Sequence, residues 1–377
     1  MSKVGSDPAS VVAGGSFLDS IRVRVTDGTN KPASGASVSF DVIAGGGSVT
    51  PATVIADANG SAAAKFITGT TPGTNTVIAT VSGVSAVPAI AFSITTVIAG
   101  TIVWSAIPMD TLRGVWGTSA SDVWAVGYHG TLEHFNGTSW SPVTSGTTEP
   151  LVGVWGTSPS NVWIVGGFTG TILHYNGTSW SSALERQQIG LLFGVWGGSA
   201  SDVWVLGDIV PALHYDGTKW SESGSVTPTI FGMWGNSSSD IWAVGYSPGP
   251  GGMIVHYNGA TWSSASPVTT QGLSGVWGTS ASDVWAAGAN GVIVHYDGTS
   301  WSSVTSPTSQ GLVSLWAASA SDAWAVGYGG AIVHYDGTSW SNMTSGTTQD
   351  LFGIWGSSDS DMWAVGTSGL LHGTRAH

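Results

Sequence analysis

A repeated tryptophan pattern constrains the chain from Trp104 onward. The segment "GVWGTSASDVW" begins at Gly114, and its second tryptophan lies eight positions after its first. The spacing occurs seven times, at Trp116 and Trp124, Trp155 and Trp163, Trp196 and Trp204, Trp234 and Trp242, Trp277 and Trp285, Trp316 and Trp324, and Trp355 and Trp363. Successive copies start 38 to 43 residues apart, which is the range in which the four-stranded blades of a β-propeller repeat.

Each copy predicts four strands, of the form "LFGVWG", "DVWAVG", "TILHYNG" and "TSWSSVT". Asn-Gly or Asp-Gly joins the third strand to the fourth in six copies. These pairs begin at Asn136, Asn176, Asp216, Asn258, Asp297 and Asp336. Because Asn, Asp and Gly tolerate the positive φ angles of a type I′ turn, each pair predicts a hairpin of that type.

The seventh copy stops after its third strand, and a segment before the first copy has the form of the missing fourth strand. "TIVWSAIP", at Thr101 to Pro108, contains a tryptophan as the other fourth strands do. These third tryptophans are Trp104, Trp140, Trp180, Trp220, Trp262, Trp301 and Trp340, and three per copy account for all 21 in the chain. We therefore predict a seven-bladed β-propeller over residues 101–377, closed by Thr101 to Pro108 as the outer strand of the last blade.

Residues 1–100 follow a different period. The segment "SIRVRVTD" places Ile21, Val23 and Val25 on one face of a half-buried strand. Similar short runs follow, separated by Gly, Pro, Asn and Asp, and about seven such strands in about a hundred residues are typical of a β-sandwich. The fold class predicted for the whole chain is therefore all-β.

The first region also resembles a known family. The ordered segments "TDG", "KPASGASVSF", "GGGSVTP" and "DANGSA" resemble the bacterial Ig-like repeat of invasins and intimins over nearly all of residues 8–97. In that family the repeat is a spacer or adhesive module of surface proteins. The resemblance implies an Ig-like β-sandwich, an extracellular or cell-surface location and no active site. The opening "MSKVGSDPAS" lacks the apolar core of a signal peptide, so the sequence leaves open whether an export signal was removed.

The repeats from residue 101 to 377 resemble the blades of Ycf48-like and Asp-box propellers. The segments "DVWAVGYHGTLEHFNGTSW" and "DVWAAGANGVIVHYDGTSW" match the Gly-Thr-Ile and turn-tryptophan elements of those blades. They differ in the turn, which has one glycine fewer and carries His-Tyr or His-Phe before it. The resemblance implies the fold, whereas propellers of one shape serve lectins, enzymes and assembly factors alike.

Composition excludes several classes of partner. Charged residues make up 8% of the chain, the formal net charge is −13, and only four basic residues lie beyond residue 100. Clustered Lys and Arg are therefore missing, and neither nucleic acid nor an anionic membrane surface is an expected partner. The chain contains no run of about 18 apolar residues, so no membrane insertion is predicted. The absence of Cys excludes disulfides and thiolate metal sites.

Two polar positions repeat with the tryptophans. The third strands carry His134, His174, His214, His256, His295, His334 and His372. The turns between the first two strands end in Asp122, Asn161, Asp202, Asp240, Asp283, Asp322 and Asp361. One interpretation is a ring of metal ligands or proton acceptors; the other is structural, with each His packed between blades and bonded to a neighbouring Ser or Asp. Because equivalent positions around a ring lie too far apart to share a metal ion, the structural interpretation is favoured and no metal or other cofactor is predicted.

Candidate ligand-binding residues fall into two sets. The third tryptophan of each blade, from Trp104 to Trp340 as given above, lies on the outermost strand, where it either stacks on a sugar or covers the blade edge. The variable loops between the second and third strands carry the aromatic residues Tyr128, Phe168, Tyr246 and Tyr328. Seven equal sites would use the tryptophans, whereas one composite site would use the variable loops.

The function predicted from these features is a non-enzymatic, extracellular binding module. No catalytic residue is assigned, because acids peculiar to single copies are scattered over different blades and no nucleophile or phosphate-binding motif is present. The favoured hypothesis is a multivalent carbohydrate-binding lectin or adhesin, whose weak sites add by avidity. The alternative is a protein-binding scaffold or subunit of a surface assembly, and a glycoside hydrolase is the third. The partners expected are glycans or a surface protein, and the sequence leaves the oligomeric state open.

Overall fold

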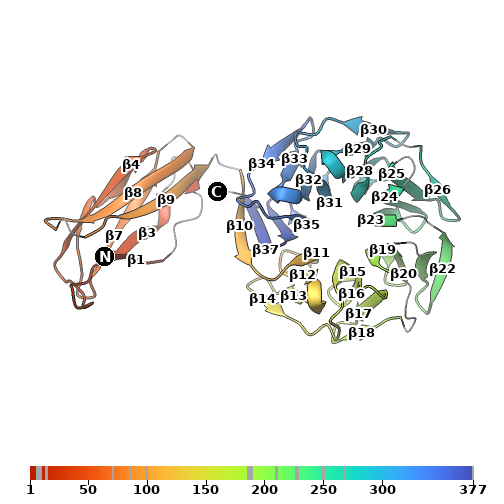
Figure 1. Ribbon diagram of the computed structural model, residues 1–377, viewed down its shortest axis with the longest axis horizontal. Coiled ribbons are helices and arrows are strands. Elements are labelled where there is room, and N and C mark those ends of the chain that lie inside the picture. The colour runs from red at the N-terminus through yellow and green to blue at the C-terminus, as the bar shows by residue number, and fades with distance from the viewer. Residues whose placement is uncertain are drawn as a thin grey trace. The chain divides into compact units, whose positions relative to one another are not determined.

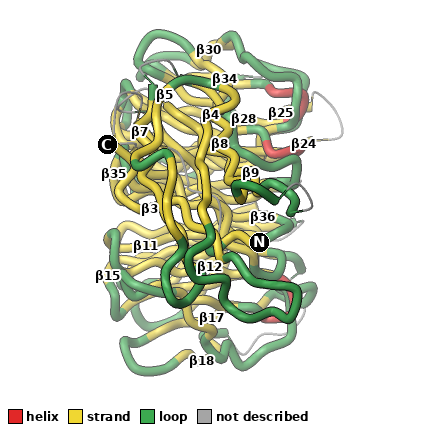
Figure 2. Tube along the Cα trace, turned by 90° about the vertical axis from the view of Figure 1, so that its left-hand side faces the viewer, coloured by secondary structure: helices red, strands yellow, loops and turns green. Residues whose placement is uncertain are grey.

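The computed structural model forms two compact units. One comprises Met1–Val103 with Thr374–His377, and the other comprises Trp104–Gly373. The structure describes residues 1–5, 11–12, 16–69, 72–84, 87–97, 101–184, 190–208, 211–225, 229–247, 251–266 and 268–375. Strands dominate both units (Figure 2), and helix among the described residues is confined to three short turns, Tyr128–Gly130, Ala289–Gly291 and Tyr328–Gly330. The all-β prediction is confirmed, and no helix of the described residues is long and apolar enough to cross a membrane.

Two sheets make up the first unit. The four-stranded sheet has the order β1 (Ser2–Lys3), β3 (Ser16–Arg24), β7 (Ser61–Thr68), β5 (Gly47–Thr50). The five-stranded sheet has the order β2 (Val11–Val12), β9 (Ile90–Val97), β8 (Gly73–Val81), β4 (Ser37–Ala44), β6 (Thr53–Ile55). Val23 and Phe66 of the first sheet share one hydrophobic core with Phe40, Val77 and Phe92 of the second. The predicted alternation in "SIRVRVTD" is present, since Ile21, Val23 and Val25 are buried.

Seven four-stranded sheets make up the second unit (Figure 1). In hydrogen-bonded order they are β11 (Leu112–Ser119), β12 (Asp122–Gly127), β13 (Leu132–Phe135), β14 (Trp140–Pro142); β15 (Leu151–Ser158), β16 (Asn161–Gly166), β17 (Thr171–Tyr175), β18 (Trp180–Ser182); β19 (Leu192–Ser199), β20 (Asp202–Gly207), β21 (Pro211–Tyr215), β22 (Trp220–Ser225); β23 (Thr229–Ser237), β24 (Asp240–Ser247), β25 (Gly251–Tyr257), β26 (Trp262–Ser264); β27 (Leu273–Ser280), β28 (Asp283–Gly288), β29 (Ile293–Tyr296), β30 (Trp301–Val304); β31 (Leu312–Ser319), β32 (Asp322–Gly327), β33 (Ile332–Tyr335), β34 (Trp340–Met343); and β35 (Leu351–Ser358), β36 (Asp361–Gly366), β37 (Gly369–Arg375), β10 (Ile102–Pro108).

The first strands of these sheets form the inside of a ring. Each contacts the first strand of the next sheet, and β11 contacts both β15 and β35, so the contacts return to their starting point. The sheet of β35 is completed by β10, which precedes all the other strands of the unit in the chain and pairs with β37 (Figure 1). This pairing leaves the ring without an open end.

Glycine allows the first strands to approach one another. A Cβ atom on Gly117 would lie 2.8 Å from the ring of Trp355 in the preceding sheet, and one on Gly156 would lie 2.8 Å from Trp116. The same relation holds at Gly197, Gly235, Gly278 and Gly356. In six copies, the glycine after the first tryptophan is thus the surface against which the first tryptophan of the preceding sheet packs; the seventh copy has Ala317 at this position.

The type I′ turns predicted between the third and fourth strands are wrong. Phe135 pairs with Trp140, so the loop has four residues, and Gly137 rather than Asn136 has a positive φ among the described residues. Asn136 Oδ1 accepts hydrogen bonds from the backbone N–H groups of Thr138 (2.9 Å) and Ser139 (3.1 Å). The side chain therefore closes a longer turn than the dipeptide alone would.

The aspartates of the equivalent turns make the same bonds. The hydroxyl and backbone N–H of Thr218 and the N–H of Lys219 donate to Asp216 Oδ1. These bonds, that of the Thr218 hydroxyl foremost, lower the pKa of Asp216 to about 2. Bonds from Thr299 and Ser300 likewise lower the pKa of Asp297 to about 2.

Candidate functional site

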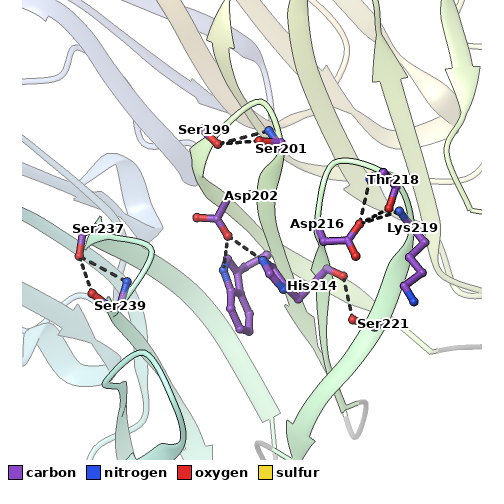
Figure 3. Close-up of polar contacts among 11 residues, drawn as sticks. Ser199, Ser201, Asp202, His214, Asp216, Thr218, Lys219, Ser221, Ser237 and Ser239 are labelled. Carbon is purple, nitrogen blue, oxygen red and sulfur yellow. Dashed lines mark hydrogen bonds and ion pairs between the residues drawn. The ribbon is translucent and has the colours of Figure 1, made fainter.

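A Trp-His-Asp unit recurs in every sheet of the ring. Its members are the second tryptophan, the third-strand histidine paired with it across the sheet, and the acid or Asn that begins the second strand. The histidine and tryptophan rings stack with centroids 3.9 to 4.3 Å apart. Histidine Nε2 lies 2.6 to 2.9 Å from Oδ1 of the acid or Asn. Figure 3 shows this arrangement at Asp202 and His214.

Further donors complete several units. The indole N–H groups of Trp204 and Trp324 donate to Asp202 (3.1 Å) and Asp322 (2.8 Å). Elsewhere a hydroxyl near the end of the first strand donates to the other carboxylate oxygen, from Thr118 to Asp122, from Thr279 to Asp283 and from Ser357 to Asp361. At Asp361 burial raises the pKa, but the bonds from His372 and Ser357 outweigh it and the pKa is lowered. At Asp361, hydrogen bonds within the fold thus favour the ionised carboxylate.

One unit carries an amide in place of the acid. His174 bonds to Asn161 Oδ1 at 2.8 Å. Burial lowers the pKa of His174 from its usual 6.5, because a neutral partner offers no charge to stabilise the imidazolium. In the part of the chain that the structure describes, no three His, Asp or Glu side chains lie together as a metal site requires. The geometry therefore supports the structural interpretation of the repeated His and Asp positions.

The outer tryptophans, defined as the seven third tryptophans, pack into the neighbouring sheet. Each meets the second tryptophan of the preceding sheet edge to face, with centroids 5.1 to 6.1 Å apart and planes 71° to 84° apart. The pairs are Trp104 with Trp324, Trp140 with Trp363, Trp180 with Trp124, Trp220 with Trp163, Trp262 with Trp204, Trp301 with Trp242 and Trp340 with Trp285. Trp104 and Trp340 are buried and the others half-buried.

Packing of this kind leaves little of each outer indole for a ligand. The Nε1 atoms of all seven outer tryptophans are buried and have no hydrogen-bond partner among the described residues. A ring that stacks on a sugar presents its face and offers its N–H beside the hydroxyls. The edge-to-face contacts account for the repetition of these tryptophans, and their predicted role in ligand binding stays a prediction.

The variable loops carry exposed aromatic side chains at one end of the ring. Tyr128, Phe168, Tyr246 and Tyr328 are 40%, 69%, 45% and 48% exposed. Tyr128 and Tyr328 directly follow second strands, Phe168 follows β16 after one residue, and Tyr246 lies near the end of β24. At this end the second strands pair with the first residues of the first strands, as Gly127 pairs with Leu112. The aromatic loops and the starts of the first strands therefore share one end of the ring, and the turns containing Asp122 and its equivalents lie at the other.

A cavity of about 350 Å³ lies among the first strands and is lined by residues of all seven sheets. Seven lining residues, which we call the channel mouth, each follow the first buried Leu or Ile of a first strand: Arg113, Val152, Phe193, Phe231, Ser274, Val313 and Phe352. A glycine follows in six of the sheets, and a Cβ on Gly114 would lie 2.4 Å from the carbonyl oxygen of Val152. Close contact between the strands thus fixes the glycines and leaves the preceding position free to vary.

Two clusters of aromatic side chains lie at the channel mouth. The Arg113 guanidinium carbon lies 4.2 Å from the Phe352 ring centroid and 5.6 Å from that of Tyr128. Phe193 and Phe231 contact each other with centroids 5.4 Å apart, and Tyr328 also lines the cavity. The sequence analysis missed the channel mouth. The sequence signal for these seven residues is that theirs is the most variable position of the repeated motif.

Hydrogen bonds hold the variable loops in place. The Phe168 N–H donates to Glu149 Oε2 at 2.9 Å, and the Gly329 N–H donates to Asp350 Oδ1 at 2.8 Å. Asn290 Nδ2 donates to Gln271 Oε1 at 2.6 Å. Each acceptor lies in a loop that leads into a first strand. Glu149 and Asp350 thus act as ties between loops and set the exposed rings in fixed positions.

The fold defines a β-propeller that follows a second β-unit along the chain. Residues 1–93 match the family model of the bacterial Ig-like domain (group 1), which confirms the family predicted for this region. The chain has no significant match among curated proteins.

Solved structures similar to this chain are propellers. A structure of Ycf48 bound to a D1 peptide is 19% identical, with a TM-score of 0.61 over 73% of this chain and 95% of that one. Ycf48 from Cyanidioschyzon merolae is 16% identical, with a TM-score of 0.60 over 72% and 98%. The WD40 β-propeller domain of Doa1 is 11% identical, with a TM-score of 0.60 over 74% and 97%. At these identities the likeness shows the fold, and no enzyme family is indicated.

Proposed function

We propose that this chain is a non-enzymatic binding module whose propeller takes a polypeptide partner through one composite face. That face, which we call the channel face, consists of the channel mouth with Tyr128, Phe168, Tyr246 and Tyr328. The observation that carries the proposal is the placement of exposed apolar groups. Among the described residues of Trp104–Gly373, every large apolar side chain exposed to solvent belongs to the channel face.

The chemistry of the channel face suits a polypeptide. Tyr and Phe supply large contact areas with few rotatable bonds, and such residues dominate the energy of protein interfaces. The loop ties at Glu149 and Asp350 reduce the entropy lost when a partner binds. The Ycf48 structure with a D1 peptide supports the proposal, because a propeller of similar fold binds a peptide.

The finer architecture is part of the same proposal. We take residues 1–100 as an Ig-like sandwich that acts as a spacer or adhesive module, and residues 101–377 as one seven-bladed propeller. The likeness of residues 1–93 to bacterial Ig-like domains supports an extracellular or cell-surface location. In that location the partner would be another surface protein.

Carbohydrate binding at seven equal sites is the competing proposal. It needs each outer tryptophan to present its ring face to a sugar, and the contacts between sheets give this less support than the exposed rings give to the channel face. A polypeptide partner at one site and glycans at seven sites predict different effects of the same substitutions.

A pair of matched variants separates the two proposals. Full-length chain is screened on a random-peptide array and on a glycan array. Phe168→Ser with Tyr246→Ser removes two exposed rings of the channel face, whereas Ser199→Ala with Ser237→Ala alters the opposite end of the ring. We expect peptide binding that weakens at least tenfold in the first variant and is unchanged in the second. Glycan binding without peptide binding, or equal effects of the two variants, contradicts the proposal.

A further inference from the structure

One side of the channel face differs in charge from the rest of the ring. The side chains of Arg113, Tyr128 and His129 form a row: the Arg113 guanidinium lies 5.6 Å from the Tyr128 ring centroid, and the Tyr128 and His129 centroids are 6.4 Å apart. We call these three residues the basic row. It stands in a chain with a formal net charge of −13. A basic group at a binding face of an acidic chain marks a position at which a partner's anion would be accepted.

No carboxylate of the described residues forms an ion pair with Arg113. The ion pairs between histidines and aspartates in the ring, such as that of His134 with Asp122, do not involve it. Its guanidinium lies over the rings of Phe352 and Tyr128. The guanidinium N–H groups donate no hydrogen bond to the side chains or backbone of the other described residues. Arginine is the side chain best suited to bind a carboxylate through two parallel hydrogen bonds.

The backbone of His129 lies in the left-handed region. Its φ is 56°, and the equivalent residues of two other sheets are Asn290 (φ 56°) and Gly329 (φ 64°). Besides glycine, Asn, Asp and His are the residues that adopt this region most often. The histidine is exposed next to Tyr128, so its side chain is accessible to a partner at the channel face.

The basic row is peculiar to the sheet that starts at β11. In the sheet of β31, the equivalent residues are Val313, Tyr328 and Gly329, so the tyrosine is kept and both basic side chains are absent. In the sheet of β27 they are Ser274, Ala289 and Asn290. The channel face therefore carries basic side chains on one side only. Such asymmetry selects the charge of a bound segment and also its orientation.

From these observations we infer that the channel face binds an acidic polypeptide segment, in which a carboxylate side chain bonds to the basic row and a neighbouring apolar side chain enters the channel mouth. The inference rests on the proposed function and names the chemistry of its partner. Val152, Phe193, Phe231 and Val313 offer an apolar contact surface within the same cavity. The remaining acidic surface repels the same partner and so restricts it to this position.

The test uses blocked hexapeptides, acetylated at one end and amidated at the other, with the central pair Glu-Phe or Glu-Leu. Matched peptides carry Gln in place of Glu, so that the side-chain carboxylate is the only difference in charge. Binding to the full-length chain is measured by calorimetry or by NMR of the indole N–H signals. We expect the Glu peptides to bind at least tenfold more tightly than the Gln peptides at low salt.

The repeats supply substitutions that the fold already accommodates. Arg113→Val and His129→Gly give the sheet that starts at β11 the residues of the sheet that starts at β31. Lys219→Ser removes a positive charge from a turn in which the equivalent residue is Ser in four other sheets. We expect Arg113→Val to abolish the preference for Glu over Gln, His129→Gly to reduce it severalfold, and Lys219→Ser to leave it unchanged.

The possible outcomes separate the inference from the function on which it rests. Equal binding of the Glu and Gln peptides, or equal loss in Arg113→Val and Lys219→Ser, overturns the acidic segment and leaves polypeptide binding standing. Failure of both hexapeptide series and of the random-peptide array overturns the proposed function and the inference together.

Discussion

The two ends of the second unit contrast in how they use repetition. The Trp-His-Asp units and the outer tryptophans are the same in nearly every sheet, and their side chains lie within or between sheets. At the channel face the equivalent positions vary between sheets and are exposed or half-buried. Positions that contact an identical neighbour must stay identical, because one change would affect a contact in a ring of equal contacts. Positions that contact solvent are free to specialise.

The largest effect expected from this comparison is loss of stability at a second tryptophan. Trp204 is 2% exposed and contacts His214, Tyr257 and Trp262. Trp204→Ala is expected to lower the free energy of unfolding by about 3–5 kcal/mol, as for other buried aromatic truncations. Phe168→Ala, at a ring 69% exposed, is expected to change it by less than about 0.5 kcal/mol. Urea unfolding of both variants measures the two changes. Similar losses in the free energy of unfolding would remove the distinction between the two ends of the ring.

The outer tryptophans test the same comparison from the side of carbohydrate binding. Trp340 is 6% exposed and packs against Trp285. Trp340→Ala is expected to cost about 3 kcal/mol of stability and to leave peptide binding at the channel face unchanged once the folded fraction is taken into account. Thermal unfolding and the glycan array are run together on this variant. A stable variant that loses glycan binding would restore the seven-site proposal.

A smaller effect is expected from the acid of a Trp-His-Asp unit. Asp202→Ala removes the acceptor shared by His214 and the Trp204 indole, and leaving these partly buried donors without a partner is expected to cost about 1–3 kcal/mol. Asp202→Asn keeps an acceptor, as Asn161 does in the neighbouring sheet, and is expected to cost less than the alanine variant. Equal costs for the two substitutions would show that the hydrogen bonds contribute little.

The smallest effect concerns the one unit with an amide. Burial lowers the pKa of His174 below its usual 6.5, so the folded state binds fewer protons there than the unfolded state does. Stability at this site is therefore complete above pH 6.5 and falls as the pH drops from 6.5 towards the lowered pKa. Asn161→Asp gives His174 a carboxylate partner and is expected to raise its pKa. An NMR titration of the histidines measures this, and an unmoved or lowered midpoint would contradict the assigned cause.

The sequence predicted the repeated part of the molecule better than the variable part. Tryptophan spacing located the strands because each ring has one packing environment, repeated in every sheet. The turns at Asn136 and its equivalents were assigned the wrong type, because the side chain bonds to two later N–H groups and so closes a four-residue loop. Arg113 and Phe231 escaped notice because a variable residue in a strand looks like noise until the ring brings seven such residues to one opening.

The pairing of β10 with β37 has a consequence for how the ring assembles. The strand that completes the last sheet, β10, is synthesised before every other strand of the ring. It therefore has no partner strand, and the indole of Trp104 stays unburied, until β37 has been synthesised. Closure then joins two segments far apart along the chain, a step whose entropic cost rises with the length of the loop that it closes. Once formed, the pairing joins the first and the last strand of the unit along the chain. Neither strand can then detach without opening the ring.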